Sequence, residues 1–156
     1  CPSCLHTWKH QYGTKVELLH ASQLIHQLIQ AGRIKLSKEI KIRTTYHDPC
    51  DLGRNTGVYE EPRAVIQAIP GLDFVELPTN RKFSVCCGGG GNVEMTDPDL
   101  SAQVAQMKLD AIRSVGADMV VTACQQCVRT MATRAKRTKS DLAVKDLTEL
   151  VVEAME

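Results

Sequence analysis

The sequence predicts an α/β fold with a mostly parallel sheet and flanking helices, in a Rossmann-like arrangement. Short apolar segments of strand length alternate with segments of helical periodicity along the chain, an order that favours parallel strands joined by helices. Glycines, prolines and other turn formers separate these segments. The 156 residues are about the length of one ordinary domain. We therefore expect one compact unit.

The first half of the chain supplies two strands and a helix before the first central cysteine. Val16–His20 has the composition of a short strand. The next segment repeats apolar residues at helical spacing until Gly32, which predicts a helix there. Ile42–Tyr46 is the next predicted strand, and it leads to Cys50. Residues 51–57 carry turn formers, so we expect a loop.

The second half continues the alternation. A helix is predicted over Glu61–Ile69, a strand over Phe74–Leu77 and another strand over Met119–Thr122. Between the last two strands, Pro98 opens a longer helix that ends at Gly116. An apolar stripe on that helix is expected to face the core, and its members are Leu100, Val104, Met107, Ala111, Ile112 and Val115.

Composition excludes several classes of function. Nineteen Lys and Arg residues balance eighteen Asp and Glu residues, so the net charge of +1 predicts no nucleic-acid partner. No apolar segment approaches the roughly 20 residues of a membrane helix, and no signal peptide is recognisable. We expect a cytoplasmic protein without direct membrane insertion, peripheral at most to a membrane complex. Seven cysteines, an odd number at mostly long spacings, favour reduced thiols over disulfides.

Five of the cysteines form the pattern C-x35-CC-x36-C-x2-C, which is typical of a metal site. They are Cys50, Cys86, Cys87, Cys124 and Cys127. Soft thiolates select zinc, copper(I) or iron–sulfur clusters. Five thiolates exceed what one tetrahedral ion accepts, and an adjacent pair suits a multi-iron cluster better than a single small ion.

The surroundings of these cysteines leave more than one interpretation open. Gly88–Gly91 directly follow the cysteine pair, and glycines let backbone amides turn towards anionic sulfur. His47, three residues before Cys50, is a ligand, a proton carrier or a polar residue that ends a strand. Cys124 and Cys127 follow a strand and begin a helix, where the thiolate pKa is lowered. That pair alone also fits a metal-free thiol–disulfide site.

The predicted topology brings the cysteines together. Ligands of open α/β sheets sit beyond the carboxyl ends of the strands. Cys50 and Cys124 each follow a strand closely. We therefore expect the three cysteine-bearing segments to converge at one edge of the sheet.

An internal repeat relates the two ends of the chain. Residues 1–29 resemble residues 124–155, with Cys1 and Cys4 at the positions of Cys124 and Cys127. Each copy is predicted to contain a C-x2-C motif, a helix, a short strand and a second helix, which Ser22 opens in one copy and Thr148 in the other. Because the chain begins with Cys1, we expect residues 1–32 to be the tail of an upstream module and residues 33–156 to be a complete one.

These motifs resemble the cysteine-rich CCG domain found in the B-type and D-type subunits of heterodisulfide reductases. The iron–sulfur subunits of bacterial glycolate, lactate and glycerol-3-phosphate oxidising enzymes are also similar. The resemblance is carried by Cys50, by Cys86-Cys87-Gly88, by Cys124-x2-Cys127, and by the segments His47–Arg54 and Glu61–Arg63. It implies that the five cysteines bind a [4Fe-4S] cluster, noncubane in the best-known relatives. Gly88, Gly89, Gly90 and His47 would then support the cluster, and Cys1 and Cys4 would belong to a second, incomplete metal site.

The resemblance also implies a function. The chain is expected to be an electron-transport module of a heterodisulfide reductase-like oxidoreductase complex, relaying electrons to or from a disulfide, a flavin subunit or a quinone. Its partners would be flavin or ferredoxin-like iron–sulfur subunits or domains, and we expect no catalysis by the isolated fragment. The cluster is expected to be easily lost in air. Two alternatives remain, a zinc-stabilised interaction module and a metal-free thiol–disulfide oxidoreductase.

Overall fold

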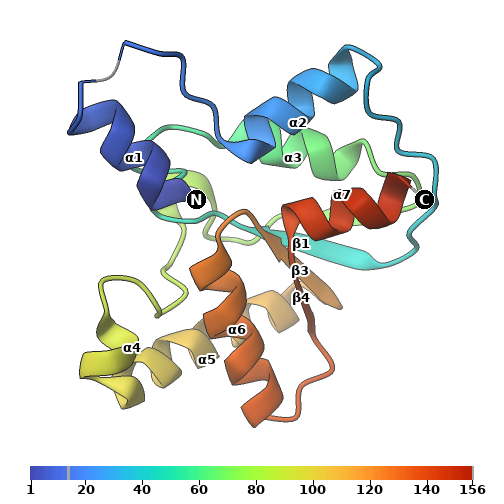
Figure 1. Ribbon diagram of the computed structural model, residues 1–156. Helices are drawn as coiled ribbons and strands as arrows, with labels where there is room; N and C mark the ends of the chain where they lie inside the picture. The colour runs from blue at the N-terminus through green and yellow to red at the C-terminus, as the bar shows by residue number, and fades with distance from the viewer. Residues whose placement is uncertain (14, 156) are drawn as a thin grey trace.

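A parallel four-stranded sheet covered by helices on both faces forms the centre of the molecule (Figure 1). The computed structural model describes residues 1–13 and 15–155. The sheet order is β2-β1-β3-β4, and all three strand pairs are parallel. The strands are β1 (Arg43–His47), β2 (Asp73–Val75), β3 (Met119–Thr122) and β4 (Ala143–Asp146). The α/β class predicted from the sequence is confirmed.

The helices form a layer on each side of the sheet. On one side, α2 (Ala21–Gln30), α3 (Glu60–Gln67) and α7 (Leu147–Met155) pack against one another (Figure 1). On the other side, α5 (Pro98–Ser114) packs against α6 (Gln125–Arg137). The shorter elements are α1 (Pro2–His10), the 3-10 helix η1 (Arg81–Phe83) and α4 (Val93–Thr96).

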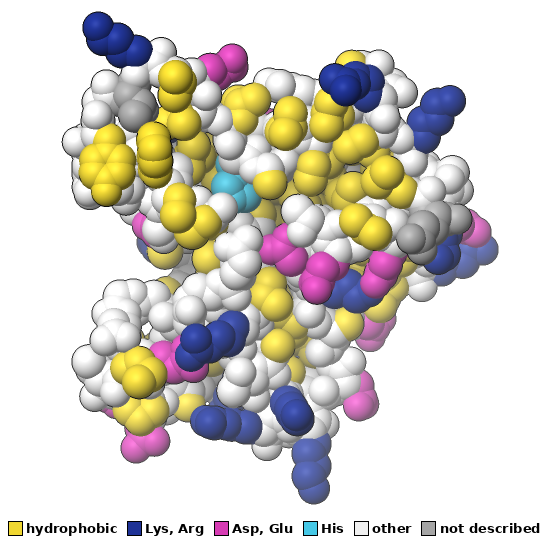
Figure 2. Space-filling view, in the orientation of Figure 1, with side chains coloured by type: hydrophobic (Ala, Val, Ile, Leu, Met, Phe, Trp, Pro, Cys, Tyr) yellow, Lys and Arg dark blue, Asp and Glu magenta, His cyan; other side chains and the backbone are white. Residues whose placement is uncertain are grey.

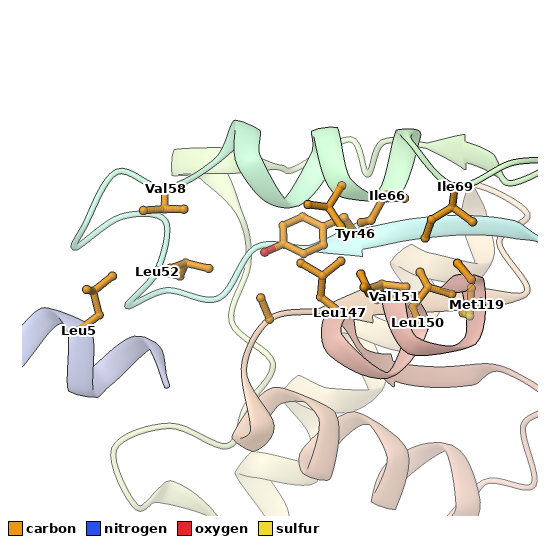
Figure 3. Packing of buried hydrophobic residues seen from close by; sticks show 14 residues of the cluster. Leu5, Tyr46, Leu52, Val58, Ile66, Ile69, Met119, Leu147, Leu150 and Val151 are labelled. Atoms are coloured by element: carbon orange, nitrogen blue, oxygen red, sulfur yellow. The ribbon is translucent and has the colours of Figure 1, made fainter. Parts of the chain in front are cut away.

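Alternating side chains of the central strand β3 fill two separate cores. Met119 and Val121 belong to the core under α3 and α7, where Tyr46 of β1 is fully buried (Figure 3). Val120 points to the opposite face and joins Leu109 and other apolar residues of α5 and α6. This alternation is what a strand covered on both faces requires. It also confirms the buried strand predicted over Met119–Thr122.

The other expected elements are confirmed in part. The strands before Cys50 and over Phe74–Leu77 appear as β1 and β2, the latter ending two residues earlier than expected. The helices before Gly32 and over Glu61–Ile69 appear as α2 and α3. Residues 51–57 form the expected turns.

The strand predicted over Val16–His20 is wrong. These residues are irregular, and Val16 is 65% exposed. No strand of the described sheet pairs with them, and an apolar composition cannot make a strand without such a partner. His20 instead caps α2 by accepting a hydrogen bond from the Ser22 amide at 3.3 Å. Ser22 is therefore not the cap, and in the second copy Asp146 rather than Thr148 accepts the capping hydrogen bond.

The core-facing stripe predicted for α5 is confirmed only at its end, where Ile112 is buried and Val115 packs half-buried against the core. Leu100 is 48% and Met107 is 64% exposed. The helix is rotated so that it buries a different face, made of Ser101, Ala105, Lys108, Leu109 and Ile112. Gly88 lies close to the helix backbone at two small residues of this face, Ser101 and Ala105. Ile112 alone belongs to both sets.

Replacing His20 by asparagine is expected to make folding less sensitive to acid. Burial lowers the pKa of His20 from 6.5 to about 4. Because the folded-state pKa is lowered, the unfolded chain binds the proton more tightly, and stability present above pH 6.5 is lost as the pH falls towards 4. The loss is about 2 kcal/mol. Asparagine retains an N-cap acceptor, so urea unfolding at pH 7 and pH 4 should show a smaller loss for the variant. An equal loss in both proteins would contradict this assignment.

Candidate metal centre

Three segments that are distant in the sequence meet at the carboxyl edge of the sheet. The chain leaves β1 at His47 and reaches Cys50, and it leaves β3 at Thr122 and reaches Cys124, the residue that precedes α6. The glycine-flanked cysteine pair follows η1. All five central cysteines line one cavity of about 470 Å³, and they are Cys50, Cys86, Cys87, Cys124 and Cys127. The expected convergence of the three segments is therefore observed.

The innermost part of this cavity contains the most buried ligand atoms. His47, Cys87 and Cys127 are all buried, and their ligand atoms lie within 4.8 Å of one another. Cys50 and Cys124 are half-buried, and Cys86 is exposed. The cysteines therefore extend from the protein interior to the surface. Every cysteine is a free thiol.

Hydrogen bonds among the side chains divide these thiols into two kinds. Hydrogen bonds from Cys127 and then Cys86 lower the pKa of Cys87. A hydrogen bond from Cys127, together with backbone amides at the start of α6, lowers the pKa of Cys124 to about 6. The two donors, Cys127 and Cys86, have their own pKa raised by the same hydrogen bonds. These shifts favour the thiolate form at Cys87 and Cys124 before any metal binds.

His47 faces this group as a neutral imidazole. Burial lowers its pKa, and the Cys87 hydrogen bond opposes that shift. Its Nδ1 atom is buried and has no hydrogen-bond partner among the described residues. A neutral ring nitrogen with no partner is suited to bind a metal or to accept a proton. The structure thus leaves both functional interpretations of His47 open and places it beside Cys87.

The glycine segment is held close to two helices. The Gly88 amide donates a hydrogen bond to Cys86 Sγ at 3.3 Å. A Cβ at Gly88 would lie 2.7 Å from the Ser101 carbonyl oxygen of α5, and one at Gly89 would lie 2.8 Å from Gln126 Nε2 of α6. A Cβ at Gly90 would meet nothing within 4 Å. Gly88 therefore fits only as a glycine, because its contacts are with backbone atoms, whereas a side chain at Gly89 would require side chains of α6 to move. Gly90 does not depend on being a glycine.

The first helix covers one side of the cavity. Pro2 and Ser3 contribute to its lining, and Ser3 donates a hydrogen bond to Asp51. Leu5 anchors α1 by packing into the core that contains Leu52 (Figure 3). Cys1 and Cys4 are exposed and do not line the cavity. The structure therefore separates these two cysteines from the five others.

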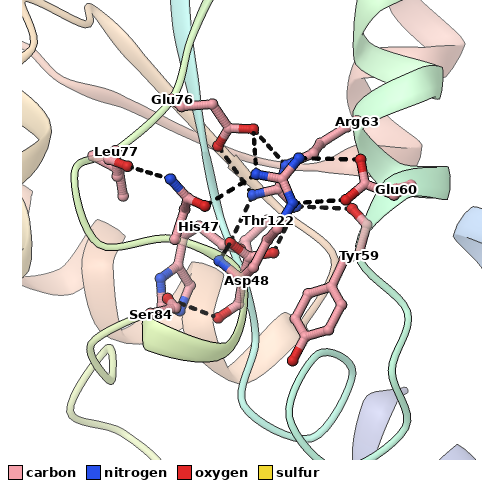
Figure 4. Close-up of polar contacts among 11 residues, drawn as sticks. His47, Asp48, Tyr59, Glu60, Arg63, Glu76, Leu77, Ser84 and Thr122 are labelled. Atoms are coloured by element: carbon pink, nitrogen blue, oxygen red, sulfur yellow. Dashed lines mark hydrogen bonds and ion pairs between the residues drawn. The ribbon is translucent and has the colours of Figure 1, made fainter.

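A polar network absent from the sequence-based predictions joins two of the cysteine-bearing segments (Figure 4). Buried Arg63 of α3 donates to both oxygens of Asp48 at 2.7 and 2.8 Å, and it also pairs with Glu76 at 2.6 Å. Asp48 accepts a further hydrogen bond from the Arg81 amide at 2.8 Å, and its carbonyl accepts one from Ser84 at 3.2 Å. Asp48 stands two residues before Cys50, and Ser84 stands two before Cys86. The network therefore fixes one segment against the other.

Asp48 lies in the segment His47–Arg54 that carries the family resemblance, but no role of its own follows from the sequence. The signal that could have revealed its role is the pair of acidic and basic residues in the two segments His47–Arg54 and Glu61–Arg63. Burial is what gives the pair its importance, because Arg63 and Asp48 side chains are only 3% and 2% exposed. Composition does not indicate whether a charged side chain is buried.

The donor set fits a metal cluster better than a single ion. A cavity of about 470 Å³ is much larger than the roughly 30 Å³ of one water-sized occupant. Its wall offers five sulfur atoms and the His47 side chain. Sulfur donors of this number match clusters with several metal corners.

Comparisons with known proteins show what this chain is similar to. The model of the CCG family, described as a cysteine-rich domain, matches residues 44–132. The chain is 38% identical to the D-type subunit of the dihydromethanophenazine:CoB–CoM heterodisulfide reductase of Methanosarcina barkeri, over 99% of this chain and 39% of that protein. It is 36% identical to the B-type subunit of the fumarate reductase (CoM/CoB) of Methanothermobacter marburgensis, over 81% of this chain and 25% of that protein. It is 30% identical to the EtfAB:quinone oxidoreductase of Syntrophomonas wolfei, over 100% of this chain and 23% of that protein.

Two further findings concern the extent of the match and the length of the helices. The chain spans about two fifths of the length of the first of these relatives, and about a quarter of the other two. In the described part of the chain, no helix has the length and apolarity needed to cross a membrane.

Proposed function

The chain belongs to the CCG family of cysteine-rich domains, and on this premise we propose that it is an iron–sulfur electron-transfer module of an oxidoreductase complex. One observation carries the proposal, the lining of a single cavity by five thiols from three separate segments. The five proposed ligands are Cys50, Cys86, Cys87, Cys124 and Cys127. The proposed cofactor is a [4Fe-4S] cluster of the noncubane type, which the adjacent pair of cysteines favours.

A bound cluster of this kind supplies one-electron chemistry. The protein contributes the ligands and their surroundings. The buried Cys87 and Cys127 would hold the inner side, and the exposed Cys86 would bind where the cavity opens to solvent. The Gly88 amide, already bonded to Cys86, would stabilise negative charge on its sulfur. His47, Gly88 and Gly89 would support these ligands.

The electron partners are proposed from the relatives. Their names include a heterodisulfide reductase, a fumarate reductase and a quinone oxidoreductase, which differ in substrate and share electron transfer. We propose that the chain relays electrons to or from a disulfide, a flavin subunit or a quinone through other subunits or domains. Exposed apolar side chains gather over α1 and α2 (Figure 2), and they include Trp8, Tyr12, Leu19 and Leu24. A patch of this kind is consistent with docking to such a partner.

The domain division also stays a proposal. Residues 33–156 would be one CCG module, and residues 1–32 would correspond to the last part of a second. Two structural equivalences support this interpretation. Cys1 precedes α1 as Cys124 precedes α6, and α2 packs beside α7 (Figure 1).

Anaerobic reconstitution with iron and sulfide tests the proposed function. The wild-type protein is expected to bind iron with an equal amount of acid-labile sulfide and to give an electron paramagnetic resonance signal in one redox state. Cys87→Ser, which removes the most central thiol, is expected to lose most of the iron. Cys4→Ser is the matched control, because Cys4 lies outside the cavity and its loss should leave the iron content unchanged. Equal iron loss in both variants would contradict the proposed ligand set.

A second candidate has its own supporting observation. His47, Cys87 and Cys127 lie close enough together to share one ion, and zinc takes four ligands of this kind. The same samples distinguish the two candidates, because stoichiometric zinc without sulfide or visible absorbance would favour the zinc-stabilised module. Turnover of small disulfides by the metal-free protein would instead favour a thiol–disulfide enzyme.

A further inference from the structure

A lysine of α5 is buried without a hydrogen-bond partner among the described residues. Lys108 of α5 is 1% exposed, and its Nζ atom finds no partner among the described residues. Burial of an isolated ammonium group lowers the stability of the folded protein. Lysines are rarely fully buried unless they are paired. The Nζ atom of Lys108 therefore lacks the compensating hydrogen bond that a buried charge requires.

Charged groups of the candidate metal centre act on Lys108. Burial lowers its pKa, and Asp48, Cys87, Cys86 and Cys127 each oppose that shift. The charge of Lys108 in turn acts on His47. Asp48 is already occupied by Arg63 and the Arg81 amide. Among the three cysteines, only Cys87 has its pKa lowered towards the thiolate form, and it lines the cavity.

The backbone explains how Lys108 reaches this place. Gly88 lies against α5 at Ser101 and Ala105, and Lys108 follows Ala105 by three residues, so it lies on the same face of the helix. Gly88, which directly follows the cysteine pair, thus rests on this face. The orientation of α5 that exposes Leu100 and Met107 is the one that buries Lys108.

We propose that Lys108 provides a fixed positive charge near the metal centre and thereby favours the more electron-rich state of the cofactor bound there. The inference rests on the proposed iron–sulfur function and adds a positioning residue that tunes its potential. Uptake of one electron from an external donor adds one negative charge to the cavity, with no bond broken and no proton required. A buried positive charge nearby lowers the energy of that added charge. Removing it should lower the midpoint potential.

Redox titration of the reconstituted protein under anaerobic conditions tests this inference. Lys108→Met removes the charge and retains an unbranched side chain, and Lys108→Arg retains the charge. Lys136→Met, at the exposed end of α6, removes the same charge from the surface. With dithionite and mediator dyes, Lys108→Met is expected to hold its electron at least tenfold less strongly than the wild type, which is about 59 mV for a one-electron couple. Lys136→Met should match the wild type, and Lys108→Arg should stay closer to it.

A second measurement needs no cofactor. Metal-free Lys108→Met is expected to unfold at the same urea concentration as the metal-free wild type or at a higher one, because a buried ammonium without a partner is replaced by an apolar group. Lower stability of the variant would assign Lys108 a structural role and overturn the inference. Full iron content with unchanged potentials would also overturn it and leave the proposed function standing. Absence of iron and sulfide from the wild type would overturn the proposed function and this inference together.

Discussion

Replacing Arg63 by methionine is expected to lower the free energy of unfolding of the metal-free protein by about 3–5 kcal/mol. Arg63 is almost fully buried, with four hydrogen bonds to carboxylate oxygens at 2.6–3.0 Å and a fifth to the Tyr59 carbonyl at 2.8 Å (Figure 4). Its Cζ atom also lies over the Tyr46 ring, 5.2 Å from the ring centroid. Without Arg63, the buried Asp48 carboxylate keeps only the Arg81 amide as a hydrogen-bond donor among the described residues. That uncompensated charge is the source of the cost.

Urea unfolding under reducing, anaerobic conditions measures this loss. Arg113→Met is the matched control, because its ion pair with Asp110 is exposed and 3.9 Å long, and it should change stability by less than about 0.5 kcal/mol. Iron binding should fall in Arg63→Met, since the network connects the segment of Cys50 with that of Cys86. Asp48→Asn should recover part of the loss when combined with Arg63→Met, because the stranded charge is then gone. Additive costs in the double variant would contradict this explanation.

Much of the fold was predictable because its information is local. The strands that become β1 and β3, and the helices α2, α3 and α5, follow from apolar periodicity and from stop signals such as Gly32 and Gly116. The failures have one cause in common, which is tertiary context. The segment Val16–His20 has a strand-like composition, but no strand of the described sheet pairs with it. Leu100 and Met107 have helical spacing, but the competing face with Ala105 packs against Gly88.

The candidate site also has features that were predictable from the sequence and features that were not. The spacing of cysteines after strands led to the expectation that three segments meet, because parallel strands deliver their carboxyl ends to one edge of a sheet. The supporting charges were not predictable from local pattern. Arg63 and Lys108 both stand at helix positions where a basic residue is ordinarily solvated. Only the packing of α3 and α5 shows that both are buried.

Replacing Gly88 by alanine is expected to destabilise the metal-free protein by about 3 kcal/mol and to reduce its capacity for iron. Gly88 adopts a φ of +93°, a conformation that side chains rarely tolerate. Its added Cβ would stand 2.7 Å from the Ser101 carbonyl oxygen and 3.1 Å from the Ala105 amide nitrogen. Both atoms belong to the backbone of α5, so the contact cannot be relieved by rotating a side chain. Backbone strain and overpacking each contribute about 1–3 kcal/mol.

Relief of this contact would move Cys86 and Cys87 away from α5, so the effect on iron should accompany the effect on stability. Gly90→Ala is the matched control, because an added Cβ there meets nothing within 4 Å and its φ lies outside the left-handed region. Gly90→Ala should therefore unfold within about 0.5 kcal/mol of the wild type and bind as much iron. If the two alanine variants lost stability equally, flexibility of the whole glycine run would explain the result better than the approach of Gly88 to α5. A large loss confined to Gly88→Ala would instead identify close packing of the cysteine pair on α5 as the feature that shapes the cavity.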